Sequence, residues 1–477
     1  MAAPEFRVVA IELYERPVAL RIPFRFGAAT VTHAPQAFVR AGIRLDDGRE
    51  ARGAAAELMI PKWFDKSPQK SNADNIDDLR RSLSFAAAAY TMETRALTAF
   101  DHFAAHYPTL IAHGAGAGLN SLTSNYGPAL IDRALLDALC RALGVSFSAA
   151  IRVNLPGINT SLTPDLAGFA IDRFVAGLTP SSTIAARHTV GMLDPIVAGD
   201  AAVRIGDGLP ETLEEVIAAY GNRYFKLKLG GDAHVDVERL VRIAAVLDRV
   251  PGYAVTLDGN EQYADSSEIG ELWRKVEATP ALAGLFAATL YLEQPLPRAI
   301  ALDADISELA QSKPLLIDES DATLDAFPTA RVAGYTGVSS KSCKGIYKSL
   351  LNAARCAHWN DDVAPRYFLS GEDLTMQAGL GVQQDLALTA LLGLRHVERN
   401  GHHYVNGFAG EHASEVEQRA FLTAHSGLYE DSHGGVRLAI RDGLIDISSL
   451  EAPGFASAAQ PDWATLEPLG VALATTT

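Results

Sequence analysis

The chain has 477 residues, 48% of them hydrophobic and 21% charged, which are the proportions of a folded globular protein and not of a disordered, collagen-like or coiled-coil chain. At about 150 residues per domain, this length suggests two or three domains. The 41 Lys and Arg residues against 57 Asp and Glu residues give a formal net charge of −16, which repels phosphate backbones and anionic lipids and so disfavours nucleic acids and membranes as partners.

The first part of the chain predicts a small α+β domain. Three strand-like sequences occur in it: FRVVAIELYER (6–16), QAFVRAGIRL (36–45) and REARGAAAEL (49–58). We expect a loop between the first two and a tight turn at Asp46-Asp47-Gly48 before the third, which together give an antiparallel sheet. Residues 73–105 are rich in Ala and Leu and predict helix, and the glycine-rich residues 114–120 are interpreted as a flexible linker.

The middle of the chain predicts a β/α barrel. After a helical stretch and a segment near 151–183 that we interpret as an insertion, eight short β-rich sequences recur, each followed by a helix-like stretch. They are IAARHTV, YFKLKL, AVTLD, LYLE, PLLID, GVSSK, RYFLS and LRHVE. Strands that alternate with helices indicate a parallel sheet, and eight of them favour a closed barrel over a doubly wound open sheet, which usually has a glycine-rich first turn. The polar residues that end these strands then share one rim.

The end of the chain departs from this period. Residues 436–447, VRLAIRDGLIDI, are typical of a hairpin that turns at Asp442-Gly443. We expect this C-terminal segment to return to the N-terminal sheet.

Three carboxylates end three consecutive predicted strands: Asp258, Glu293 and Asp318. Because the C-terminal ends of barrel strands meet at one mouth, these side chains are expected to be neighbours. Carboxylate and water oxygens are the ligands that Mg²⁺ prefers, whereas zinc favours His or Cys, which are absent from these strand ends. The sequence therefore predicts a magnesium site.

Lysines flank these carboxylates. Lys226 and Lys228 are separated by one residue, so on a strand both point the same way, which here is inward. We expect their mutual repulsion to lower the pKa of at least one of them, so that it acts as a base. Lys341 ends the sixth predicted strand, across an eight-membered ring from the second strand.

These residues resemble the enolase superfamily, in the muconate-lactonizing subgroup of the mandelate racemase/muconate lactonizing enzyme family. The matching motifs are Lys-Leu-Lys at 226–228, Asp-Gly-Asn at 258–260, Glu-Gln-Pro at 293–295, Asp-Glu-Ser at 318–320, and Lys341 ahead of Lys344-Gly345-Ile346. The resemblance covers most of the chain. It implies a (β/α)7β TIM-like barrel at residues 126–400, with an α+β capping domain built from residues 1–125 and the C-terminal segment 401–477.

The resemblance also implies roles for individual residues. Asp258, Glu293 and Asp318 are implied to bind Mg²⁺, Lys228 and Lys341 to be acid/base catalysts on opposite faces of the substrate, and Lys226 and Asn260 to assist the substrate carboxylate and the metal. A small-molecule carboxylate is the implied substrate, and a homo-oligomer is the implied assembly.

The eighth strand differs from one branch of the family. Dipeptide epimerases that resemble this family carry Asp-x-Asp there to hold an ammonium group, whereas this chain has Glu398-Arg399-Asn400. We therefore expect Glu398 and Arg399 to contact an acidic or polyhydroxylated substrate, with Arg399 pairing a second carboxylate.

The predicted function is Mg²⁺-dependent abstraction of the proton α to a substrate carboxylate through an enolate intermediate, in a racemase, epimerase or cycloisomerase. β-Elimination of a hydroxy or sugar acid uses the same parts and is an alternative. Two other classes are a Schiff-base lysine aldolase, which leaves the three carboxylates unexplained, and a non-catalytic relative.

Some residues have weaker signals. His188 lies near the end of the first strand, and the pair His402 and His403 is expected to be a solvated loop pair. Phe24, Phe26 and Trp63 fall in segments that relatives fold over the barrel mouth.

The three cysteines, Cys140, Cys343 and Cys356, have no CxxC spacing and indicate neither a disulfide framework nor a thiolate zinc site. The N-terminal sequence lacks the basic start of a signal peptide. These features favour a cytoplasmic location.

Overall fold

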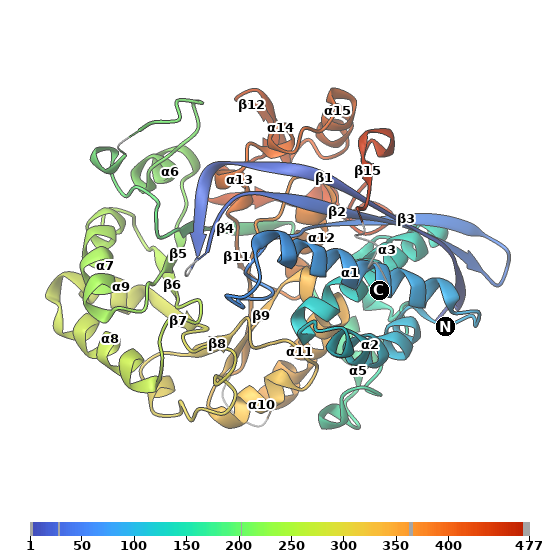
Figure 1. Cartoon of the computed structure of the whole chain (residues 1–477), viewed down its shortest axis with the longest axis horizontal. Helices are drawn as coiled ribbons and strands as arrows, with labels where there is room; N and C mark the ends of the chain where they lie inside the picture. The colour runs from blue at the N-terminus through green and yellow to red at the C-terminus, as the bar shows by residue number, and fades with distance from the viewer. Residues whose placement is uncertain (1–2, 27–28, 202, 362–365, 471–477) are drawn as a thin grey trace.

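The computed structural model describes residues 3–26, 29–201, 203–361 and 366–470. Its centre is a closed barrel of eight parallel strands, and a separate antiparallel sheet with long helices lies against the barrel (Figure 1). This arrangement confirms the predicted barrel and the predicted N-terminal sheet.

The antiparallel sheet consists of β1 (Phe6–Phe26), β2 (Ala29–Leu45), β3 (Glu50–Leu58) and, on the outer edge, β15 (Glu467–Pro468), in the order β15-β1-β2-β3. The expected loop between the first two strands is wrong. β1 and β2 pair from Pro17↔Pro35 to Phe26↔Ala29, with a shift in register between Ala19 and Phe24, and form one long hairpin. Alternating apolar residues continue through Val18 and Leu20 to Phe24, which is the period of a strand. The hairpin carries Phe24 to the barrel mouth.

Three long helices complete the capping region: α1 (Asn72–Met92), α2 (Ala99–Gly116) and α3 (Ser121–Leu143). Ser71 caps α1 in a reciprocal capping box with Asp74. Helix α2 includes residues 114–116, so the first three of the seven residues of the predicted linker are helical and the other four connect α2 to α3. Helix α3 lies directly on β3 because Gly53 has no side chain: a Cβ there would lie 2.1 Å from the backbone nitrogen of Ala138.

All eight predicted barrel strands are present. They are β4 (Thr183–Val190), β5 (Tyr224–Lys228), β6 (Ala254–Asp258), β7 (Thr289–Glu293), β8 (Leu315–Ile317), β9 (Gly337–Ser340), β10 (Phe368–Gly371) and β11 (His396–Glu398). Each pairs in parallel with the next, and pairing of β11 with β4 closes the ring.

Helices surround the barrel between its strands: α6 (Leu213–Tyr220), α7 (Ala233–Leu247), α8 (Ser266–Ala278), α9 (Ala283–Ala288), α10 (Ala326–Ala333), α11 (Ile346–Asn360) and α12 (Leu380–Leu391). The connection from β7 to β8 is the exception, because residues 294–314 contain only the 3₁₀ turn Leu309–Gln311 and no α-helix. The expectation of a helix after every strand is wrong at this point.

The segment interpreted as an insertion leads from α4 (Phe147–Arg152) through α5 (Ile171–Ala176) to β4. It is anchored to the barrel side, because Arg355 on α11 makes two hydrogen bonds to Asp165, of 2.7 and 2.8 Å.

The C-terminal segment contains α13 (Gly401–Tyr404), α14 (Gly407–Gly410), α15 (Glu415–Ala424), β12 (Tyr429–Ser432), β13 (Gly435–Leu438) and β14 (Leu444–Asp446). A turn forms at Asp442-Gly443, but its flanking strands do not pair with each other: β13 pairs with β12, and β14 joins the barrel beside β4. The predicted hairpin turn is thus confirmed by an antiparallel bridge between Arg441 and Leu444, whereas the predicted pairing of the strands on either side is wrong. The predicted return to the N-terminal sheet is confirmed by β15.

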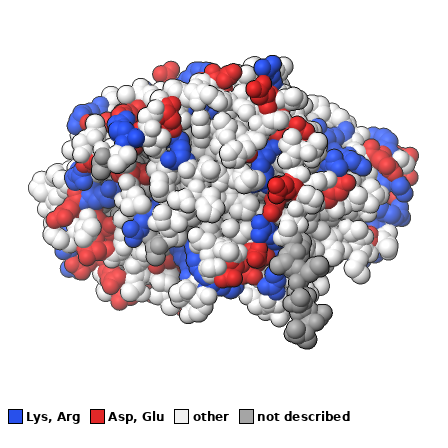
Figure 2. Space-filling view, turned by 45° about the horizontal axis from the view of Figure 1, so that its top comes forward, with Lys and Arg blue, Asp and Glu red and all other residues white. Residues whose placement is uncertain are grey.

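Buried apolar residues form two clusters, one in the capping region and the barrel wall it covers and one between the barrel strands and their outer helices. Among the described residues, no helix is long and apolar enough to span a bilayer. On the face shown in Figure 2, acidic and basic side chains are interspersed, without a large patch of one sign.

Candidate active site

Charged side chains meet at the C-terminal ends of the barrel strands. The strand register aligns Lys228 with Asp258 and Asp258 with Glu293, while Asp318 and Lys341 directly follow β8 and β9. Local alternation along each strand sets which residues face inward, and closure of the ring brings them together. The structure thus gathers the predicted metal ligands and lysines at one end of the barrel.

A small cavity lies among these groups. Its lining residues are Phe24, Ile60, Trp63, Lys226, Lys228, Asp258, Asn260, Asp318, Lys341, Asp373, Leu374, Thr375, Glu398 and Asn400. It encloses about 20 Å³, which is roughly the room that one water needs. Phe24 and Trp63, which are 4% exposed each, close it from the capping side. The side chain of Phe26 lies outside the described residues. A carboxylic acid therefore enters only when the capping side chains move.

Lys226 is the centre of the charge network. Its Nζ lies 3.0 Å from Asp258, 2.7 Å from Glu293, 2.7 Å from Glu372 and 3.0 Å from Glu398. The ammonium group is 1% exposed, so this contact with four carboxylates replaces its hydration. Burial alone lowers the pKa of Lys226, but these carboxylates outweigh it and raise the pKa well above its usual value.

The two predicted catalytic lysines face the cavity from opposite sides of the ring. Lys228 Nζ lies 2.5 Å from Asp258 Oδ2, and Lys341 Nζ lies 2.5 Å from Asp318 Oδ2. Burial lowers the pKa of Lys341, but Asp318 outweighs it, so the pKa is raised. The pKa lowering expected from repulsion between Lys226 and Lys228 is wrong for Lys226, because four carboxylates contact its ammonium group. The ring of Trp63 also stabilises the charged form of Lys341, because its centroid lies 4.3 Å from Lys341 Nζ.

The pKa values of the three carboxylates are shifted in different directions. Burial raises the pKa of Asp258 and of Asp318, but nearby lysines outweigh it and lower both pKa values. The pKa of Glu293 is raised well above its usual value by burial and then by the negative charges of Asp258 and Glu372. This crowding of negative charge is what a divalent cation would relieve.

The residues fit Mg²⁺ in kind, since all three predicted ligands are hard oxygen donors at adjacent strand ends. In this structure, lysines contact all three predicted ligands: Asp258 contacts Lys226 and Lys228, Glu293 contacts Lys226, and Asp318 contacts Lys341. Among the described residues, no three His, Cys, Asp or Glu side chains are arranged to hold a metal. Asp258 and Asp318 line the cavity, whereas Glu293 lies beneath Lys226. Metal binding thus requires the lysines to give up contacts.

The predicted substrate-contacting residues are separated by the fold. Lys226, Asn260 and Glu398 line the cavity, but Arg399 does not. Arg399 is 1% exposed and forms ion pairs with Asp373 and with Asp385 on α12. The expectation that Arg399 pairs a second substrate carboxylate therefore does not fit this geometry, because both ends of its guanidinium group are already bound.

Glu372 is a carboxylate whose role the sequence did not indicate. It contacts Lys226 and is held from below by hydrogen bonds from Arg187 and Ser370, with Tyr291 3.1 Å away. Burial raises its pKa, but Arg187 and Lys226 outweigh this and lower it. The predicted seventh strand ends at Ser370, whereas β10 ends at Gly371, so the position of Glu372 directly after this strand is a signal that the sequence contains.

The histidines are not solvated. His402 and His403 on α13 are 5% and 3% exposed and pack against His188, which lies on the outer side of β4 and does not line the cavity. The solvated loop pair expected from the sequence is wrong, because the C-terminal segment folds over this strand.

The capping segment after β3 is fastened to the barrel rim. Lys66 donates to the carbonyl of Asn260 at 2.8 Å and pairs with Glu261 at 2.7 Å. Arg298 donates to the carbonyls of Trp63 and Phe64, each at 2.9 Å. These bonds hold Trp63 over Lys341.

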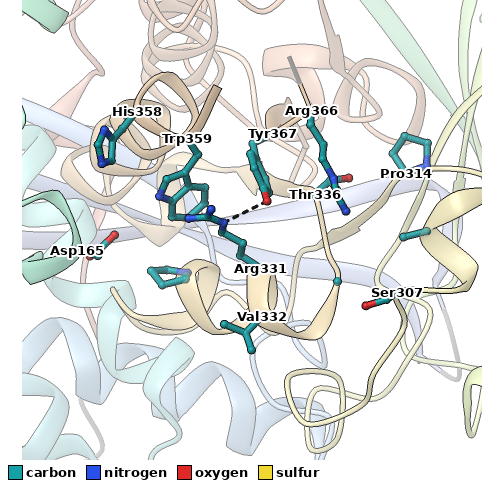
Figure 3. A pocket seen from close by; sticks show the side chains of 13 residues that line it. Asp165, Ser307, Pro314, Arg331, Val332, Thr336, His358, Trp359, Arg366 and Tyr367 are labelled. Atoms are coloured by element: carbon teal, nitrogen blue, oxygen red, sulfur yellow. Dashed lines mark hydrogen bonds between the residues drawn. The ribbon is translucent and has the colours of Figure 1, made fainter. Parts of the chain in front are cut away.

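A second hollow, of about 1080 Å³, lies at the other end of the barrel (Figure 3). Its residues Pro314, Thr336 and Tyr367 precede β8, β9 and β10, so they mark the N-terminal ends of these strands. Arg331 lies there between Trp359 and Tyr367. Since barrel enzymes carry their chemistry at the C-terminal ends, the smaller cavity is the candidate active site.

Comparison with known proteins agrees with this geometry. A family model described as "Enolase C-terminal domain-like" matches residues 208–461, more than half of the chain. A comparison with curated proteins finds no match.

Solved structures share the fold at low identity. A muconate lactonizing enzyme from Mycobacterium smegmatis, complexed with muconolactone, is 18% identical with a TM-score of 0.59, covering 96% of this chain and 98% of its own. The L-Ala-D/L-Glu epimerase of Bacillus subtilis is 17% identical, with a TM-score of 0.57 and coverages of 95% and 99%. A dipeptide epimerase from Methylococcus capsulatus, complexed with Mg and L-Arg-D-Lys, is 18% identical, with a TM-score of 0.56 and coverages of 92% and 99%. Because the family model matches more than half of the chain, the chain belongs to the enolase superfamily, in the mandelate racemase/muconate lactonizing enzyme family.

Proposed function

We propose that this protein is a Mg²⁺-dependent racemase, epimerase or cycloisomerase that removes the proton α to a substrate carboxylate through an enolate intermediate. The observation that carries the proposal is the placement of Lys228 and Lys341, which line one cavity from the second and sixth strands of an eight-stranded ring. Such a pair reaches a bound α-carbon from both faces. One lysine removes the proton and the other returns it.

Asp258, Glu293 and Asp318 would hold the Mg²⁺ ion. When bound, Mg²⁺ supplies Lewis-acid stabilisation of the negative charge that develops on the substrate carboxylate, and it competes with the lysines for Asp258 and Asp318. Two solved relatives of this fold contain bound Mg. Lys226 would contribute a fixed positive charge beside the carboxylate, and Lys341, whose pKa is raised in this structure, is suited to donate a proton.

The clustered carboxylates disfavour a Schiff-base aldolase. That chemistry uses a lysine as the nucleophile and gives Asp258, Glu293 and Asp318 no role.

The test is exchange of the α-proton in D₂O, followed by NMR, on a panel of chiral carboxylic acids with Mg²⁺. In a two-base enzyme, Lys341→Ala stops exchange from one enantiomer and Lys228→Ala stops exchange from the other, and either change abolishes full turnover. Asn159→Leu, in the segment before β4, serves as a control variant away from the cavity. Normal exchange of both enantiomers by Lys341→Ala would contradict the proposal.

A further inference from the structure

The candidate site contains a hydrogen-bond acceptor that no group of the described chain uses. Asn400 lines the cavity and is 2% exposed. Its Nδ2 donates to Glu398 Oε1 at 3.3 Å, while its Oδ1 is buried without a hydrogen-bond partner. Because the ionised Glu398 only accepts hydrogen bonds, the amide is fixed with its nitrogen toward Glu398 and its oxygen away. A buried acceptor without a partner in the protein is unfavourable unless a ligand or an ordered water satisfies it.

Asn260, on the other side of the cavity, repeats this pattern. Its Nδ2 lies 3.3 Å from Glu319 Oε1, and its Oδ1 is buried without a partner. The site therefore presents two neutral amide oxygens from different strands. A metal ion satisfies such an oxygen, whereas an organic ligand that does so must carry N–H or O–H donors.

The charged acceptors of the cavity are already used. Glu398 accepts from Thr189 at 2.5 Å, from Lys226 at 3.0 Å and from the backbone of Asp373 at 2.9 Å, in addition to Asn400. Asp373 in turn accepts from Arg399 and from the backbone nitrogens of Met376 and Asn400. Neither carboxylate is left over for an ammonium group of a substrate.

The positively charged side chains of the cavity also have partners within the protein. Those that line the cavity are Lys226, Lys228 and Lys341, and each contacts a carboxylate. No arginine lines it among the described residues, since Arg399 is bound to Asp373 and Asp385. These lysines, with Mg²⁺, can neutralise the substrate carboxylate next to the reacting carbon. The cavity has no further cation to neutralise a second substrate carboxylate.

The remaining lining is apolar except for Thr375. Phe24, Ile60 and Trp63 come from the capping region and Leu374 from the loop after β10, and all are 4% exposed or less. Such a lining favours an apolar substituent on the substrate.

We propose, on the basis of the function proposed above, that the substrate is a monocarboxylic acid whose α-substituent carries a neutral N–H or O–H donor beside an apolar side chain. Asn400 Oδ1 accepts that donor. Dicarboxylic acids and free α-amino acids are excluded, because the first bring an unmatched negative charge and the second an unmatched ammonium group.

The experiment compares five acids that share an isobutyl side chain and differ only at the α-substituent: acetamido (N-acetylleucine), hydroxyl, methoxy, ammonium (leucine) and carboxymethyl (isobutylsuccinate). Binding with Mg²⁺ is measured by calorimetry and α-proton exchange by NMR in D₂O. We expect the acetamido or the hydroxyl acid to bind and exchange on the order of 10²-fold better than the methoxy acid, which keeps the ether oxygen, is intermediate in size between the two and has no donor. The better of the two identifies the donor as amide or hydroxyl, and either result supports the proposal.

Variants of Asn400 assign the effect to this residue. Asn400→Leu is similar in size and removes the acceptor, so the ratio of hydroxyl to methoxy binding should fall to near 1. Asn400→Asp should improve leucine relative to the hydroxyl acid. Asn159→Leu should leave both ratios unchanged, and circular dichroism checks that each variant folds. An unchanged hydroxyl-to-methoxy ratio in folded Asn400→Leu would overturn the assignment.

The two proposals fail in different ways. Equal or better binding and exchange of isobutylsuccinate or leucine overturns the substrate class and leaves proton abstraction standing. Donor-dependent binding without exchange of any α-proton supports the substrate class and overturns proton abstraction. Neither binding nor exchange of any of the five acids overturns the substrate class.

Discussion

Replacement of Lys226 by Met tests the charge network at its centre. Met has nearly the length of Lys and no charge, so the change leaves Asp258, Glu293, Glu372 and Glu398 without the cation that lies 2.7–3.0 Å from each of them. Breaking a buried ion pair costs about 3–5 kcal/mol, because a charge stays buried without compensation. Glu293 already has a raised pKa and can take up a proton, so we expect the lower end of this range.

Mg²⁺ should compensate for much of this loss. A ligand at 100 times its Kd stabilises the folded state by about 2.7 kcal/mol, and in the variant Mg²⁺ no longer competes with the Lys226 ammonium group for Asp258 and Glu293. The assay is urea unfolding followed by circular dichroism, with and without Mg²⁺, on the wild type and on Lys226→Met. Mg²⁺ should raise the unfolding midpoint of the variant more than that of the wild type.

The matched control is Lys275→Met on α8, where Lys275 pairs with Glu271 at 3.2 Å at the surface. Such exposed pairs contribute about 0–1 kcal/mol, so this variant should unfold close to the wild type. If Lys226→Met unfolded at the wild-type midpoint without Mg²⁺, or gained no more from Mg²⁺ than the wild type, the interpretation of the network as a buried charge cluster would be refuted.

Two further predictions concern the metal site and pH. Glu293→Gln removes a buried negative charge next to Asp258 and Glu372, so the fold should persist while Mg²⁺ affinity in calorimetry falls on the order of 100-fold; undiminished affinity would remove Glu293 from the ligand set. Burial lowers the pKa of His188 to about 3, below the value of about 6.5 in an unfolded chain. The unfolded state therefore binds more protons, and the contribution of His188 to stability is complete above pH 6.5 and falls by roughly 1.4 kcal/mol per pH unit as the pH drops toward 3. Urea unfolding from pH 7 to pH 5 should show a shallower loss of stability for His188→Gln, and parallel curves would show that His188 is not buried as a neutral side chain.

The sequence by itself determined the barrel and the identity of its reactive rim. Each of the eight strands ends within about two residues of the predicted position, because a strand and the helix after it are specified by local periodicity. Alternation along β5 was enough to place Lys226 and Lys228 on the same inward face. The strand sequences that end in Asp258, Glu293 and Asp318 could be aligned on one rim, since parallel strands with regular connections put their C-terminal ends together.

Only the tertiary structure decided which of these side chains are available to contact a substrate and which are bound to other residues. Arg399 lies one residue from Glu398, yet α12 supplies Asp385 and removes the guanidinium group from the cavity. His402 and His403 are buried because the C-terminal segment packs over β4. The pKa of Lys341 depends on Asp318 from a neighbouring strand, and its aromatic neighbour Trp63 comes from the capping region. Local sequence sets the direction of a side chain, whereas its partners come from segments distant in the chain, and in a buried site those partners determine charge and availability.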